Sequence, residues 1–159
     1  MKLTIAGIGK IKEKWMKAGI GEYAMRLAPM ARFQIIEQEE EKMPANPSPA
    51  IKEKVMEKEG EKILKYVSDD DFVVLLDTGG KEISSTALSE LLSSKMVAGK
   101  SSFVFLIGGP FGNGQNLRRR ADVLLSLSPM TFTHQMARLI LAEQLYRAMK
   151  IMRHEPYHL

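Results

Sequence analysis

The stretch FVFLIGGPFGNG at residues 103–114, with VLLSLSPMTF at residues 123–132, decides the fold of this 159-residue chain. Each begins with an apolar run, which is typical of a central strand covered on both faces. The first run ends in a glycine-rich loop and the second in a loop of hydroxyl side chains and proline. Glycines after a strand let a ligand approach the backbone and its amide donors. An ordinary strand-to-helix connection is the alternative interpretation of each loop.

The rest of the chain alternates between short apolar runs and amphipathic segments. We expect strands at 3–8, 33–37, 72–76, 103–107 and 123–127, and helices at 13–27, 49–67, 85–97 and 134–152. This alternation predicts one α/β domain, a mostly parallel sheet with helices on both faces. Residues 38–49 are expected to form a loop, and 77–81 to turn the chain. Because ligands bind beyond the carboxyl ends of parallel strands, the strand ends at Leu76-Asp77, Gly108-Gly109 and Leu127 to Thr131 are candidate site positions.

Composition limits the function. The chain has no cysteine, which excludes disulfides, thiolate metal sites and cysteine nucleophiles, and its three histidines are too few and too C-terminal for a convincing metal site. A net charge of +4 with a sequence pI of about 9.3 modestly favours phosphate-rich partners. No signal pattern and no apolar stretch of the roughly 20 residues that a membrane span needs is present. We therefore expect a cytoplasmic protein with no membrane partner.

Two short motifs are weaker evidence of function. Gly7-Ile8-Gly9 follows the first strand, but Lys12 occupies the place of the third glycine of a dinucleotide-binding fingerprint. The basic run 118–120 follows the glycine-rich loop on a short helix, where it is either an RNA-phosphate contact or a solvated basic edge.

The final helix is apolar on more than one side, which predicts packing on the sheet and on a second subunit. Glu143 and Arg147 stand four residues apart with the acid first, a stabilising order. Arg147 is therefore either a helix-surface residue or a phosphate contact.

With these residues in view, the chain resembles the ribosomal large subunit methyltransferase H family, a small single-domain branch of the SPOUT methyltransferases. The resemblance covers essentially the whole chain and is most specific in its last third. Its matching segments are Ile107-Gly108-Gly109-Pro110 with Gly112, Leu125-Ser126-Leu127-Ser128 with Met130-Thr131, His134-Gln135 with Arg138, Glu143 to Ala148, and Pro156-Tyr157-His158.

The resemblance implies a parallel α/β domain whose C-terminal segment forms a deep trefoil knot, an exception to the general rule against threading. It implies a homodimer that binds S-adenosylmethionine, uses no metal, and methylates N3 of a pseudouridine in helix 69 of 23S ribosomal RNA on assembled ribosomes. The cofactor contacts carried over by position are Leu76, Gly108, Leu127, Ser128, Pro129, Met130, Thr131 and Phe132. These lie at the three strand ends chosen above from the residues alone.

Methylation at N3 also requires loss of the imide proton. His158 and Tyr157 on the tail are the first candidates to order the site or assist that loss, either within one chain or across the dimer. Arg147 would hold a phosphate or the developing negative charge, and His134 is expected to be structural. Two other functions stay open: a SPOUT enzyme acting on another RNA such as transfer RNA, and a non-catalytic ribosome-binding module.

The chain departs from the family pattern at two places. Thr133 stands where family members usually have proline, which changes how rigidly the loop enters the final helix. Leu159 follows His158, where the family usually has a basic residue, so one phosphate contact is expected to differ.

Overall fold

The computed structural model describes residues 1–157, and strands and helices alternate along them. The elements are β1 (Lys2–Ile8), α1 (Lys14–Leu27), β2 (Arg32–Gln38), α2 (Pro49–Leu64), β3 (Phe72–Glu82), α3 (Ser85–Val97), β4 (Ser102–Ile107), α4 (Gln115–Arg120), β5 (Val123–Ser126) and α5 (His134–Met152). The predicted alternation is confirmed, and so is the parallel sheet: the strands pair in the order β2-β1-β4-β3-β5, every pair parallel.

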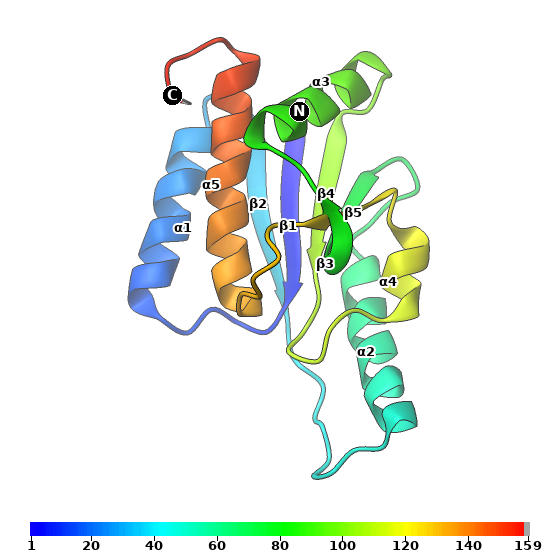
Figure 1. Ribbon diagram of the computed structural model, residues 1–159. Helices are drawn as coiled ribbons and strands as arrows, with labels where there is room; N and C mark the ends of the chain where they lie inside the picture. Colours follow the sequence, from blue (N-terminus) through cyan, green and yellow to red (C-terminus); the bar gives the residue numbers. More distant parts are fainter. Residues whose placement is uncertain (158–159) are drawn as a thin grey trace.

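Helices cover both faces of the sheet, with α1, α3 and α5 on one side and α2 and α4 on the other (Figure 1). Successive side chains of a strand point to opposite faces, so each central strand contributes to two cores. In β4, Phe103 and Phe105 pack with the α1, α3 and α5 side, whereas Val104 and Leu106 pack with α2 and α4. This explains why the strand shows no alternation of polar and apolar residues.

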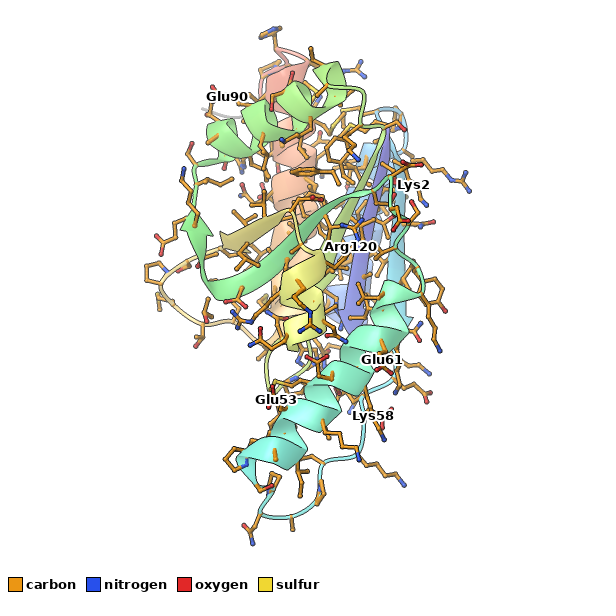
Figure 2. All side chains as sticks on the ribbon, turned by 90° about the vertical axis from the view of Figure 1, so that its right-hand side faces the viewer. Lys2, Glu53, Lys58, Glu61, Glu90 and Arg120 are labelled. Atoms are coloured by element: carbon orange, nitrogen blue, oxygen red, sulfur yellow. The ribbon has the colours of Figure 1, made fainter. Side chains whose placement is uncertain are left out.

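The charged side chains of α2 point away from the sheet, as the sequence predicts for a solvated face. Figure 2 looks at this side of the molecule and shows Glu53, Lys58 and Glu61 on its surface, where all three are exposed. One acid of the helix is an exception, because Glu59 lies in the buried stripe of α2 beside Ile63.

The expected turn at residues 77–81 is wrong. The third strand continues to Glu82, and after a register shift Lys81 pairs with Leu125 of β5. Gly80 lies so close to β5 that a Cβ atom there would come within 2.6 Å of the Leu124 carbonyl carbon. The glycines therefore serve a close backbone approach inside an irregular strand.

Three hydroxyl side chains begin helices. Ser48 accepts a hydrogen bond from the Ile51 amide, with Pro49 at the first helical position, as predicted. Ser84, one of two expected candidates, caps α3. Thr133 caps α5 by accepting from the Met136 amide. The residue that departs from the family pattern thus supplies a cap that proline lacks.

The width of the apolar face on α5 has an explanation within one chain. The helix lies on the sheet with α1 along one side and α3 along the other (Figure 1). Leu141, Leu145 and Ala148 are fully buried there. The wide apolar set therefore does not by itself require a second subunit.

Candidate functional site

A cavity of about 770 Å³ opens at the carboxyl ends of the strands. Its walls come from segments far apart in sequence: Leu76 to Thr78 within β3, the glycine-rich loop after β4, the loop after β5 and the first turn of α5, with Lys12, Glu13 and Met16 before and in α1. Pockets of this size hold small organic ligands. The three strand ends chosen from the sequence therefore meet at one site.

Most of the predicted cofactor residues line this cavity. They are Leu76, Gly108, Leu127, Ser128, Met130, Thr131 and Phe132. Pro129, the remaining member of the predicted set, lies between two lining residues without belonging to the wall itself.

The glycine-rich loop is fastened to the end of β3 by one side chain. The Asn113 amide nitrogen donates to the Leu76 carbonyl and to Asp77 Oδ2, both at 2.9 Å. Asp77 is buried, and its other oxygen accepts from the Gly79 amide at 2.9 Å. Arg118 reaches Asp77 Oδ2 at 2.8 Å from α4. These bonds fix two cavity walls relative to each other, and sequence reasoning did not find them.

The loop after β5 is ordered by its hydroxyls. Ser126 donates to the Ser128 carbonyl at 3.0 Å, and the Ser128 hydroxyl accepts from the Met130 amide at 3.0 Å. This local turn leaves Met130 75% exposed and Phe132 44% exposed beside the cavity. The loop thus offers apolar surface together with backbone groups, a combination suited to a flat heteroaromatic ring.

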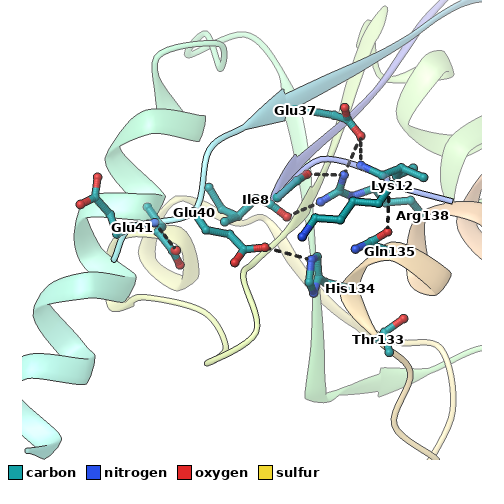
Figure 3. A network of polar contacts seen from close by, with 12 residues as sticks. Ile8, Lys12, Glu37, Glu40, Glu41, Thr133, His134, Gln135 and Arg138 are labelled. Atoms are coloured by element: carbon teal, nitrogen blue, oxygen red, sulfur yellow. Dashed lines mark hydrogen bonds and ion pairs between the residues drawn. The ribbon is translucent and has the colours of Figure 1, made fainter. Parts of the chain in front are cut away.

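A buried arginine joins the start of α5 to the end of β1 (Figure 3). The guanidinium of Arg138 is fully buried, donates to Gly9 O at 2.7 Å and to Glu37 Oε1 at 2.9 Å, and also donates to Ile8 O. A Cβ atom on Gly7 would lie 2.7 Å from the Arg138 Nε atom. The glycine that suggested a dinucleotide motif therefore makes room for this side chain.

His134 lines the cavity at the first position of α5. Its Nε2 atom lies 3.5 Å from Glu40 Oε1 and is buried without a hydrogen bond. Burial and the nearby positive charge of Arg138 lower the pKa of the imidazole below its usual value of 6.5. His134 is therefore neutral at pH 7, which agrees with a structural role.

The two described catalytic candidates lie at the other end of α5. Arg147 is 13 residues beyond His134, and at 1.5 Å per residue that separation is about 20 Å. Arg147 donates to Glu143 Oε1 from Nε at 3.0 Å and from a terminal nitrogen at 2.6 Å, so the predicted i,i+4 pair forms. Tyr157 donates to the same oxygen at 3.3 Å. His158, the third candidate, lies outside the described residues.

The tail packs on α5 through Tyr157. Its ring meets that of Tyr146 edge to face at 4.7 Å, and the Arg147 guanidinium lies 4.8 Å from the ring centre. Burial, with a smaller effect of Tyr23 and Glu143, raises the pKa of Tyr157 to about 12. The phenol therefore stays protonated at neutral pH, where it donates a hydrogen bond rather than accepting a proton.

Within residues 1–157, no cluster of three or more acidic or histidine side chains is placed to hold a metal ion. Across the same residues no helix combines the length and apolar character that crossing a bilayer requires.

The fold and the cavity define a class of enzyme. A family model described as "Predicted SPOUT methyltransferase" matches residues 1–158, and the chain belongs to this family. SPOUT methyltransferases use S-adenosylmethionine as the methyl donor.

Relatives make the similarity more specific. The chain is 49% identical over 158 residues to the ribosomal RNA large subunit methyltransferase H of Carboxydothermus hydrogenoformans. It is 48% identical to the protein of the same name from Halothermothrix orenii and 44% identical to a putative one from Methanococcus maripaludis. Each comparison covers 99% of both chains. The resemblance stated from the sequence motifs is thus confirmed.

Proposed function

We propose that this protein transfers a methyl group from S-adenosylmethionine to N3 of a pseudouridine in helix 69 of 23S ribosomal RNA, on assembled ribosomes in the cytoplasm. The observation that carries the proposal is the cavity at the carboxyl ends of the strands. Seven of the residues that the family resemblance assigns to the cofactor line that cavity, from strand β3 and the loops after β4 and β5. Full-length similarity to proteins named for large-subunit ribosomal RNA supports the choice of substrate.

The cavity suits the cofactor in size and in chemistry. A volume of about 770 Å³ accommodates a molecule of nucleoside size. Two buried polar atoms of cavity-lining residues, Asn113 Oδ1 and His134 Nε2, have no hydrogen-bond partner within the described residues. Buried polar atoms normally have a hydrogen-bond partner, so a polar ligand bound here would supply the partners that these two atoms lack. We propose that residues 127–132 hold the adenosine part and that Leu76 and Gly108 complete its walls.

The role of the protein's own residues is to position the nucleophile against the methyl group. Bound S-adenosylmethionine supplies a methyl group already activated by its sulfonium charge. N3 of the base forms a bond to the methyl carbon as the carbon–sulfur bond breaks, and the N3 proton passes to a base or to solvent. Fixed walls that align the nucleophile with the methyl carbon lower the barrier by several kcal/mol. The bonds from Asn113 and Arg138 keep those walls in place.

We propose that a homodimer completes the site. Arg147 lies ten residues beyond Ala137, the last residue of α5 that lines the cavity, which is about 15 Å along the helix, and Tyr157 packs beside Arg147. In one chain these two residues therefore lie away from the cavity. A second copy would bring its tail to the first cavity. There Arg147 would hold a phosphate or the developing negative charge, Tyr157 would order the site as a donor, and His158 would assist proton loss. We also propose the trefoil knot that the family resemblance implies.

The test is transfer of labelled methyl from S-adenosylmethionine to ribosomes that lack this modification, followed by mass-spectrometric mapping of the labelled nucleotide. We expect label on the helix 69 pseudouridine and none on free transfer RNA. Label only on transfer RNA would contradict the substrate. Ribosome binding without any affinity for S-adenosylmethionine, measured by calorimetry, would favour a non-catalytic binding module.

A substitution in the cavity wall tests whether the activity depends on the cavity. Thr131 is an exposed wall residue, so Thr131→Trp fills the cavity from a position where folding is little affected. The variant is expected to lose cofactor binding and methyl transfer together. Retained transfer in this variant would separate the activity from the cavity.

A further inference from the structure

The three consecutive arginines of α4 have different environments, and the difference assigns one of them a role. Arg120 is used by the fold, because it donates to the carbonyl of Ser68 at 2.7 Å and to that of Asp71 at 3.1 Å. Arg119 is exposed and does not line the cavity. Arg118 lines the cavity and is held by Asp77. The basic run is thus neither a uniform phosphate contact nor a uniform solvated edge.

The carboxylate of Asp77 fixes the direction of Arg118. The Asp77 side chain is only 4% exposed, and its oxygens also accept from the Gly79 amide and from Asn113. A buried carboxylate with three donors is fully engaged and holds its partner strongly. The Arg118 side chain is 38% exposed. A guanidinium carries five N–H donors, and the bond to Asp77 uses one terminal nitrogen, so further donors remain on a side chain that lines the cavity.

The surroundings of this side chain fit RNA. Arg118, Met130 and Phe132 are among the exposed residues that line the cavity, and Lys12 and Thr131 are others. Proteins that recognise single-stranded or looped RNA combine apolar or aromatic surfaces, on which a splayed base stacks, with cations that hold the adjacent phosphate. An arginine fork binds a phosphate through two parallel hydrogen bonds.

We propose that Arg118, oriented by Asp77, binds the RNA phosphate next to the nucleotide whose base enters the cavity. The inference rests on the proposed function, since it assumes that the substrate of the cavity is RNA. It makes Arg118 a substrate-binding residue contributed by the same chain that holds the cofactor. The tail residues proposed above would act from the other chain.

The test compares Arg118→Ala with Arg119→Ala, a matched control that removes the same charge one residue away. We expect Arg118→Ala to raise the KM for ribosomes about tenfold, the order expected for one charged hydrogen bond. It should also reduce the slope of log KM against log salt concentration by about one, as expected for one lost phosphate contact. Arg119→Ala should leave both quantities near those of the unmodified protein.

Two further measurements keep the result interpretable. Arg118→Ala leaves the Asp77 carboxylate unpaired, so the double variant Asp77→Asn with Arg118→Gln removes the arginine without a buried charge, and it should show the same loss. Calorimetry with S-adenosylmethionine should show a smaller change in Kd than in the KM for ribosomes in both variants, because Asn113 still donates to the Leu76 carbonyl and joins the two walls. A weakened Kd with an unchanged salt slope would assign Arg118 to the carboxylate of the cofactor and overturn the proposal. Equal effects at Arg118 and Arg119 would also overturn it.

Failure of the proposed function is distinguished from failure of this inference, because it would appear as absent methyl transfer to ribosomes by the unsubstituted protein. Co-sedimentation with ribosomes at several salt concentrations compares Arg118→Ala and Arg119→Ala without any turnover. If these two variants sediment alike, the inference is wrong whether or not the protein methylates ribosomes.

Discussion

The two ends of α5 hold their arginines in opposite ways. Near the start of the helix, Arg138 is fully buried and its two terminal nitrogens donate to the carbonyls of Ile8 and Gly9 and to Glu37. Near the end, Arg147 is 26% exposed and bonds a single carboxylate, that of Glu143. The first arrangement fixes the backbone under the cavity, whereas the second leaves a cation available to a ligand. Residue type alone does not distinguish them.

The largest effect is expected from Arg138→Met. Removing the guanidinium leaves the buried carbonyls of Ile8 and Gly9 without this donor and leaves Glu37 with the Ile11 amide alone. Breaking a buried pair of this kind costs about 3–5 kcal/mol. Urea unfolding measures the loss. Arg26→Met is the control, because Arg26 pairs with Glu22 on the exposed side of α1, where such a pair contributes little to stability. Equal losses at the two positions would show that Arg138 does not secure this end of the helix.

Arg147→Ala should instead affect turnover. Because Arg147 lies at the surface with an i,i+4 partner, its loss is expected to change stability little. If it stabilises developing charge, kcat should fall about 100-fold while the Kd for S-adenosylmethionine stays constant. Arg153→Ala, which removes another exposed arginine near the same helix end, should retain activity. Wild-type turnover in Arg147→Ala and also in His158→Ala would remove the tail from the mechanism.

A smaller effect is expected at the helix start. Thr133→Ala removes the hydroxyl that accepts from the Met136 amide and should destabilise the protein by about 1 kcal/mol. Thr133→Ser keeps the hydroxyl and should retain most of that stability. Chemical denaturation of the two variants measures whether the Thr133 cap compensates for the missing proline. An equal loss of unfolding free energy in both variants would show that the hydroxyl does not stabilise the helix start.

The smallest effect concerns pH. The lowered pKa of His134 means that the unfolded chain binds the proton more readily than the folded protein. The stability associated with neutral His134 is therefore fully present above pH 6.5 and is lost as pH falls from 6.5 toward the folded pKa. His134→Gln should show a weaker decline over that range. Urea titrations at pH 5 and pH 7.5 give the comparison, and identical pH dependence in the two proteins would contradict it.

The sequence predicted what depends on local pattern. Continuous apolar runs located the strands, and Ser48 with Pro49 marked the start of α2. The glycines at 79 and 80 misled the prediction, because Gly80 serves an approach to β5, which lies more than 40 residues away in sequence. A local pattern does not distinguish a turn glycine from one that admits a neighbouring backbone.

The candidate site also has a part that the sequence predicted and a part that it did not. Strand ends and the family resemblance together located the cofactor loops, and the cavity unites them. The bonds that support those loops were not predictable, since Asn113 joins Asp77 across 36 residues and Arg138 joins Gly9 across 129. Their partners are backbone carbonyls and a common acid, which leave no signature in sequence.

The central claim is that the cavity of one chain works with the tail of another. The most direct measurement is the activity of a purified mixed dimer, made by coexpressing differently tagged Thr131→Trp and Arg147→Ala chains, each inactive alone. If the tail acts across the dimer, one of the two sites combines an intact cavity with an intact tail. The account then predicts about half of the wild-type methyl transfer per dimer. An inactive mixed dimer, with both parent chains folded, would contradict it.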